Sequence, residues 1–471
     1  MGALGLCLVL LTLGADPSED LEGAAPKAAE EEQFVLNFGA KLEALYGTEL
    51  IGSVDQYSVT SNFVLEPAIL VQQRSHTGQV TIVYVPWLLY TPAVPDQKLL
   101  FNRVLVEVEQ QLSRTVGIYL VARLWVGDQT FSPVVNLGTA PGTAPAGGGG
   151  TGPPSTTTIP LVPQSATLNL IDTSARLGVY VLTSAVFRLD LDVGYLYSEG
   201  LNELARQELP LQRGPFLDVV GTLKLQTHDA LLTTLRSGLL VYGPVYRPGG
   251  SNNENGSTVL LPHYNTGLSI WGTEAGLKWQ HSLDATLSME LGGGLGVVYQ
   301  SSSYDIPSLV DEDLLWLHRT PVPATTTVYP IFGASIRDQV PLVNQTLLLS
   351  ATLAVLPIVD QFSGNVIQRL DLSASALWGV GNNWLFEASA GAAASANPRE
   401  IDARAELRAV FQASPHVILA GGARIAYLNY AVPGALNGTS WVLFLSVAGA
   451  SGKLGTVAGA STSQGDLGFL Q

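Results

Sequence analysis

The residue types that usually carry catalysis or metal binding are sparse and scattered in this chain. The single cysteine, Cys7, lies in an apolar N-terminal stretch, so a chain cleaved behind that stretch has no thiol for a nucleophile, a disulfide or a zinc site. No two of the six histidines have the HxxxH or HExxH spacing of a metal site. Without a clustered nucleophile and base, we expect no enzymatic activity, no cofactor and no metal.

Two further segments could suggest a ligand, but their context argues against one. The glycine run at 147–150 is followed by neither a lysine nor a helix-like segment, so it predicts a flexible loop and not a phosphate site. The acidic triplet at 311–313 lacks the alternating ligand spacing of a calcium loop. We interpret both as solvated loops.

The charged residues instead recur with a period of two. In 187–197 (FRLDLDVGYLY) apolar side chains occupy every odd position, while Arg188, Asp190 and Asp192 lie between them. This alternation is typical of a strand with one apolar and one polar face. The polar face carries charges of both signs in five such segments, and its candidate site residues are Arg188, Asp190, Asp192, Asp218, Lys224, Glu274, Lys278, Glu290, Arg369, Asp371, Asp402, Arg404, Glu406 and Arg408.

The same period predicts strands along most of the chain. Seventeen candidate strands lie near residues 57–73, 78–91, 98–113, 115–132, 165–184, 185–199, 214–228, 229–246, 264–282, 283–301, 325–340, 346–361, 365–380, 382–396, 399–413, 415–431 and 440–451. Many are 12–18 residues long by these bounds, well above the usual strand length of about 5–6. An additional strand at 34–46, a segment that also suits a short amphipathic helix, makes the count eighteen; sixteen is the competing count.

The connections between these strands alternate in length. Short ones follow Leu112, Leu182, Gln226, His281 and Ala413, whereas long ones occupy 133–164, 200–213, 247–263, 302–324 and 432–439. Barrels of the outer membrane show such alternation, with short periplasmic turns and longer external loops.

The apolar strand faces need a cover, and lipid is the one that the sequence favours. Only two helix-like pieces, 201–209 and 308–318, are present, too few to cover so many strands. No run of 18 apolar residues predicts a transmembrane helix, although mean hydropathy is +0.26. In hydrocarbon a sheet must close on itself. Aromatic residues near the predicted strand ends would form interfacial girdles: Tyr84, Trp87, Tyr90, Trp125, Tyr195, Tyr197, Tyr242, Trp271, Trp279, Tyr299, Trp378, Trp384, Tyr427 and Trp441.

Together these features resemble those of a Gram-negative outer-membrane β-barrel of the porin-like kind. The resemblance covers about residues 34–451 and is architectural, without a diagnostic motif. It implies an all-β fold, a transmembrane antiparallel up-and-down barrel, in the bacterial outer membrane. Around the barrel (34–451) we expect a signal peptide at 1–15, an acidic disordered linker at 16–33 and a C-terminal tail or short terminal strand at 452–471.

Three functional hypotheses follow from this reading. The first is a passive channel for small polar solutes, because barrels of about 16–18 strands leave an aqueous lumen. The second is a structural or adhesive outer-membrane barrel whose external loops bind a partner, and the third is a soluble β protein. Partners would be outer-membrane lipid and small solutes, with a possible homo-oligomer; the net charge of −16 argues against nucleic acid and suggests a mild cation preference.

Overall fold

The computed structural model describes most of the predicted barrel. The described residues are 33–48, 59–92, 98–131, 166–202, 205–206, 211–226, 228–243, 245–248, 251–252, 258–259, 262–283, 286–307, 320–342, 345–359, 366–381, 383–396, 399–430 and 438–451. The predicted signal peptide (1–15), nearly all of the linker (16–33) and the tail (452–471) lie outside them, so these three predictions stay predictions.

Eighteen long strands form one sheet, and every strand predicted from the sequence is present. The strands are β1 (Gln33–Gly47), β2 (Thr60–Arg74), β3 (Gly78–Tyr90), β4 (Lys98–Gln111), β5 (Val116–Phe131), β6 (Ala166–Leu182), β7 (Phe187–Gly200), β8 (Gln212–Gln226), β9 (Asp229–Tyr242), β14 (Ser269–Ser282), β15 (Leu287–Gln300), β18 (Thr325–Leu342), β19 (Gln345–Val359), β20 (Val366–Val380), β21 (Trp384–Ala396), β22 (Arg399–Ser414), β23 (Val417–Tyr430) and β24 (Gly438–Ala450).

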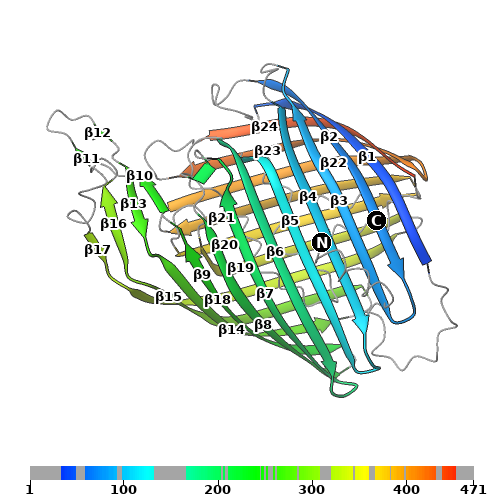
Figure 1. The fold of residues 1–471 in the computed structure, drawn as a ribbon. Helices are drawn as coiled ribbons and strands as arrows, with labels where there is room; N and C mark the ends of the chain where they lie inside the picture. Colours follow the sequence, from blue (N-terminus) through cyan, green and yellow to red (C-terminus); the bar gives the residue numbers. More distant parts are fainter. Residues whose placement is uncertain are drawn as a thin grey trace, which may run out of the picture.

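The sheet closes into a barrel (Figure 1). Each strand pairs antiparallel with the next, and the last strand, β24, pairs with β1 over Gly39–Gly47 and Val442–Ala450. Closure gives every one of the eighteen strands a neighbour on both sides, as a sheet in hydrocarbon requires. The all-β, up-and-down barrel architecture expected from the resemblance is therefore confirmed, with eighteen strands and not sixteen.

The segment at 34–46 belongs to the wall as β1 and is not a helix. Phe34, Leu36 and Phe38 point outward and are 66%, 45% and 51% exposed. Val35, Asn37 and Lys41 occupy the opposite face. The residue pattern of this segment, which suited both a strand and a short amphipathic helix, is therefore that of a strand.

The connections follow the predicted alternation of short and long. Those at one end of the barrel, the short-turn end, span two to four residues, as between β6 and β7 (183–186) or β22 and β23 (415–416). Those at the other end, the long-loop end, are mostly longer, although only 397–398 separate β21 from β22. Strand β1 starts and β24 finishes at the short-turn end.

Two of the long connections carry small sheets of their own. Strands β10 (Val245–Pro248), β13 (Pro262–Thr266), β16 (Ser303–Pro307) and β17 (Thr320–Val322) form a four-stranded sheet, and β11 (Ser251–Asn252) pairs with β12 (Thr258–Val259). Figure 1 shows these strands projecting beyond the long-loop end of the barrel.

Aromatic side chains ring the outer surface near both ends. Trp271 and Trp279 share the outward face of β14 and are 55% and 37% exposed. They lie eight residues apart, roughly 27 Å along a strand, close to the apolar band of about 25 Å seen in such barrels once strand tilt is included. Three predicted girdle residues were assigned wrongly: Trp87, Trp125 and Tyr242 fall on the inward register of their strands.

Of the two helix-like predictions, the structure tests one in part and the other not at all. Within 201–209 only Ala205 and Arg206 are helical among the described residues, and 308–318 lies outside them. Among the described residues, no helix has the length and apolarity needed to cross a membrane.

Candidate functional site: the inner wall of the barrel

The pairing register of the strands assigns the two faces of the wall. Directly paired residues of neighbouring strands share a face, and on β7 the outward Leu191 and Val193 are 43% and 51% exposed. Asp190 and Asp192, between them, point inward and are 4% and 0% exposed. The ladder places all fourteen predicted site residues on inward-facing positions.

The first charged cluster is centred on Asp192 of β7. Its carboxylate accepts hydrogen bonds from the hydroxyl of Tyr119 on β5 and the guanidinium of Arg176 on β6. One residue pair closer to the short-turn end, Arg188 is 2.7 Å from the carboxylate of Asp190 and lies over the ring of Tyr180, 4.7 Å from its centroid. Burying these charges is tolerated because each has an opposite charge and a hydrogen-bond partner.

The second cluster continues the first across β8, β9 and β14. Arg236 Nε donates to Asp218 Oδ1 over 2.9 Å, while Arg236 Nη1 is 3.9 Å from Glu274 Oε2. Asp218 is also the direct ladder partner of Asp192. The two neighbouring carboxylates are therefore compensated by arginines on opposite sides, Arg176 and Arg236.

The third cluster surrounds Glu290 of β15. Its carboxylate pairs with the ammonium of Lys278 and accepts hydrogen bonds from Gln280 Nε2 (2.5 Å) and Ser335 Oγ (3.2 Å). Three consecutive strands, β14, β15 and β18, thus meet at one carboxylate.

The fourth cluster spans the seam where β24 meets β1. Lys41 lies 2.5 Å from Glu43 and 3.8 Å from Glu66, and Arg103 of β4 also reaches Glu66, at 3.3 Å. On the other side of the seam, Arg424 of β23 lies 3.7 Å from Glu43 and 2.9 Å from Glu406. This chain of ion pairs bridges the closing strand pair from inside.

The remaining predicted residues are distributed around these clusters. Arg369 and Asp371 pair along β20 at 2.6 Å, and Arg408 lies 3.9 Å from Glu387. Asp402 and Arg404 occupy neighbouring inward positions of β22, two residues apart. Lys224 is exposed near the short-turn end and forms no ion pair with another described residue.

The described inner wall is balanced in charge. Among the side chains that the structure describes, fourteen of those on inward positions are basic and fourteen are acidic, so the net charge of −16 is not carried by this surface. The basic ones are Lys41, Arg74, Arg103, Arg123, Arg176, Arg188, Lys224, Arg236, Lys278, Arg337, Arg369, Arg404, Arg408 and Arg424. The acidic ones are Glu43, Glu66, Glu107, Glu109, Asp172, Asp190, Asp192, Asp218, Glu274, Glu290, Asp371, Glu387, Asp402 and Glu406.

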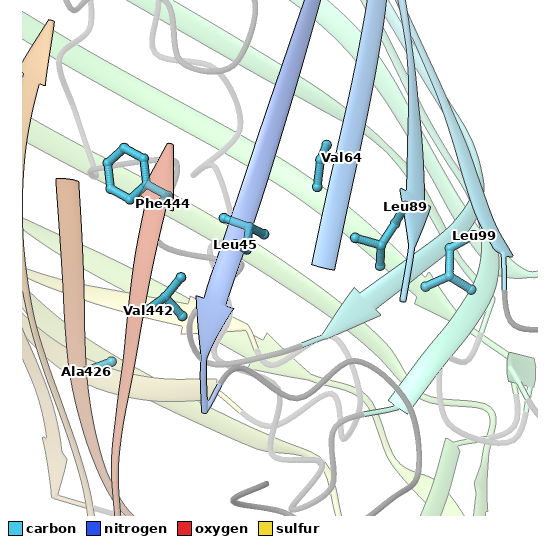
Figure 2. Close-up of a cluster of buried hydrophobic side chains, with 7 residues drawn as sticks. All are labelled: Leu45, Val64, Leu89, Leu99, Ala426, Val442 and Phe444. Carbon is cyan, nitrogen blue, oxygen red and sulfur yellow. The ribbon is translucent and has the colours of Figure 1, made fainter. Parts of the chain in front are cut away.

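Part of the inner wall is apolar, which the sequence did not predict. Figure 2 shows a buried cluster on the inward face beside the seam: Leu45, Val64, Leu89, Leu99, Ala426, Val442 and Phe444. These side chains are at most 8% exposed. Because they alternate with exposed outward residues such as Leu443 and Leu445, several strands are apolar on both faces there.

One hairpin end departs from the wall and leans over the lumen. Strand β18 pairs with β19 only up to Phe332 and Val355, although β19 continues to Val359 and pairs there with β20. Extending the register by two residues would set Pro330 opposite Pro357, and neither can donate a ladder hydrogen bond. Beyond this point Val366 packs against the inward cluster of Tyr242, Ile270 and Val298.

A cavity lies where this hairpin end meets the wall. About 1200 Å³ of unoccupied space, including the opening to solvent, is bounded by residues of β5–β9, β14, β15, β19 and β20. Charged groups line it (Arg123, Asp172, Arg236 and Glu274), together with the apolar Phe216, Tyr242, Ile270 and Val298. A few charged groups within an apolar lining are typical of small-molecule sites.

Many residues of this surface were missed from the sequence, and a period-two signal could have found some of them. Arg176, Arg236 and Arg424 lie at inward positions of predicted strands, but their flanking residues do not alternate cleanly. Glycine is one reason, since Gly178, Gly238 and Gly422 also face inward and weaken the polar pattern. The contribution of the β19–β20 hairpin depends on register, which the period alone does not give.

No group of three or more potential metal ligands lies together among the described residues. No family model and no curated protein matches the sequence.

Solved structures that resemble the chain are outer-membrane proteins with low sequence identity. The copper transporter OprC aligns at 12% identity and a TM-score of 0.44, over 88% of this chain and 65% of that one. OpdQ of Pseudomonas aeruginosa aligns at 9% and 0.40 (88% and 97%), and the ferric-catecholate import receptor Fiu of E. coli K12 at 10% and 0.39 (88% and 81%). The chain thus spans just under two thirds of OprC and nearly all of OpdQ.

Proposed function

We propose that the protein is an outer-membrane channel through which small polar solutes diffuse passively. The observation that carries this proposal is the division of the wall, with exposed leucine, valine and aromatic side chains outside and paired charges of both signs inside. A charge on the lipid side costs about 2–4 kcal/mol at mid-membrane, so the charged face belongs to water. Eighteen strands enclose a lumen of the size that carries water in porins.

Orientation follows from the connections. Barrels of this class have short periplasmic turns, so the short-turn end would face the periplasm. The four-stranded sheet of β10, β13, β16 and β17 and the pair β11–β12 would then face the outside of the cell. The chain would reach the outer membrane through the periplasm. No catalytic role is proposed.

A planar lipid bilayer tests this function directly. Purified, refolded protein should produce discrete conductance steps, and with a KCl gradient the reversal potential should lie near zero, because the described wall is balanced in charge. A folded preparation without steps would contradict the channel. A reversal potential close to that of an ideal cation or anion channel would contradict the balanced wall.

The alternative is a structural or adhesive barrel that binds a surface partner. The ordered sheet of β10, β13, β16 and β17, which projects beyond the barrel, is the observation that favours it. A barrel that gives no conductance, and that loses binding to bacterial surfaces or matrix when 245–266 is deleted, would support this alternative.

A further inference from the structure

The cavity beneath the β19–β20 hairpin end carries charges of both signs on two separate walls. Arg123 of β5 and Asp172 of β6 contribute to one wall. Arg236 of β9 and Glu274 of β14, direct ladder partners, contribute to the other. Most other charged clusters inside the barrel consist of close ion pairs. In the cavity, by contrast, Arg123 and Glu274 each lack a close ion pair among the described residues.

The guanidinium of Arg123 has unused hydrogen-bonding capacity. Its Nε is buried without a hydrogen-bond partner, and the group forms no ion pair within 4 Å among the described residues. It lies instead over the ring of Trp125, 4.5 Å from the centroid. An anionic group bound beside Arg123 would supply the ion pair that this guanidinium lacks among the described residues.

The carboxylate of Glu274 is the complementary open group. Its ion pair within the part of the chain that the structure describes is the long 3.9 Å contact with Arg236, whose Nε is already bonded to Asp218 at 2.9 Å. The Glu274 side chain is 30% exposed toward the cavity. It is therefore free to accept hydrogen bonds from a cation.

Apolar side chains line the same cavity as these two groups. Phe216, Tyr242 and Ile270 are 7%, 4% and 2% exposed and contribute to the same cavity, and Val366 of the hairpin end packs against Tyr242 and Ile270. A solute that satisfied Arg123 and Glu274 would have its body against this surface, where the burial of hydrocarbon favours binding.

From this arrangement we propose that the cavity binds a compact zwitterion with an apolar side chain, its carboxylate at Arg123 and its ammonium at Glu274. A solute with one charge leaves either Arg123 without an ion pair or Glu274 with only its long contact to Arg236, whereas a zwitterion supplies a partner to both. The inference deepens the proposed function, since the zwitterion would be a solute that passes through the lumen.

The test compares three probes with the same branched hydrocarbon body. Leucine carries both charges, 4-methylpentanoate carries only the carboxylate and isoamylamine carries only the ammonium. In calorimetric titrations of the full chain folded in detergent, leucine should bind at least about tenfold more tightly than either other probe, since each bond between charged groups contributes that much or more.

Two substitutions assign the charges. Glu274→Gln should weaken leucine about tenfold and leave 4-methylpentanoate unchanged, and Arg123→Gln should weaken leucine and 4-methylpentanoate but not isoamylamine. Glu290→Gln, in a cluster outside the cavity, is the matched control and should leave all three affinities unchanged. Heat-modifiable gel migration verifies that each variant is folded, and the probe series on the unmodified protein stands even if a variant fails to fold.

Several results would overturn the proposal. Equal binding of leucine and 4-methylpentanoate would make the cavity a simple anion site, and unchanged leucine binding in Glu274→Gln would remove the cation from it. Bilayer recordings on the same preparation distinguish failure of the zwitterion site from failure of the proposed channel. Conductance without leucine binding contradicts the zwitterion site alone, and leucine binding without conductance contradicts the channel alone.

Discussion

At the scale of single residues, the stability of the wall depends on how its buried charges are paired. Asp192 is fully buried, and its carboxylate is held by the Tyr119 hydroxyl and the Arg176 guanidinium. Desolvating a carboxylate costs several kcal/mol, so removal of one partner leaves a charge with little compensation. Exposed pairs such as Arg206–Glu199 do not bear this cost, because water solvates both groups.

Replacing Arg176 with methionine tests this dependence. Arg176→Met should lower the free energy of unfolding by about 3–5 kcal/mol, because it leaves Asp192 buried without its cation. The double variant Arg176→Met/Asp192→Leu should recover most of this loss, since no uncompensated charge stays behind. Urea unfolding in lipid vesicles measures both values.

Arg206→Met is the matched control for this experiment. Its side chain is 60% exposed and 3.5 Å from Glu199, so the substitution should change the stability by less than about 1 kcal/mol. If Arg176→Met were as stable as the control, the buried pair would contribute nothing and the account of the Asp192 cluster would be wrong.

At the scale of strands, aromatic rings fill the space above glycines on neighbouring strands. Tyr119 lies opposite Gly178, Tyr180 opposite Gly117 and Phe216 opposite Gly194, all as direct ladder partners on the inner face. A Cβ at each of these glycines would overlap the partner ring. The pairs lock the register of β5–β8, because sliding by one residue would send each ring to the other face.

Adding a methyl group at one glycine tests this interlocking. Gly178→Ala should destabilise the barrel by about 1–3 kcal/mol, because the new Cβ would collide with Tyr119 and Asp192. Gly333→Ala, where the nearest atom is a carbonyl oxygen 4.0 Å away, should be nearly neutral. Equal midpoints of urea unfolding for the two variants would contradict a role for the glycine–aromatic pairs.

The strands also show where prediction from sequence succeeds and where it stops. Period-two alternation identified β7 and β22 nearly residue by residue, because lipid outside and polar groups inside impose opposite residue types. It failed for Trp87, Trp125 and Tyr242, whose nearness to strand ends suggested a girdle but whose parity places them inside. The pairing register decides whether a side chain faces inward or outward, and its distance from the strand end does not.

For the candidate site, residue spacing predicted the charged residues of the polar face but not the cavity. The fourteen predicted residues are inward by register, yet Arg123 was not among them, and the cavity depends on the departure of β19 from β18. That departure follows from Pro330 and Pro357 being opposed once the pairing is known. Two prolines 27 positions apart carry no such meaning until the register between their strands is fixed.

At the scale of the whole molecule, closure connects these features. Eighteen strands could be counted from the sequence because each long apolar-faced segment is bounded by turn residues, and an even count lets both ends of the wall meet at the short-turn end. The ion pairs from Arg103 to Glu406 then bridge the β24–β1 seam. Polar inner and apolar outer faces are thus a property of the ring as a whole.

The most direct test of the central claim is the accessibility of successive residues along one strand of the protein in a lipid bilayer. Single cysteines at positions 372–376 of β20 replace small or apolar side chains, in a Cys7→Ser background that removes the only native thiol. Ser373 and Ser375 face inward, where Ser373 bonds Thr352 and Ser375 bonds Ser350, whereas Leu372 and Ala374 are exposed on the outside. Cysteines at 373 and 375 should react with a water-soluble thiol reagent, and fluorophores attached at 372, 374 and 376 should be quenched by spin-labelled lipid. Equal reactivity at all five positions, or quenching at 373 and 375, would contradict a barrel with lipid outside and water within.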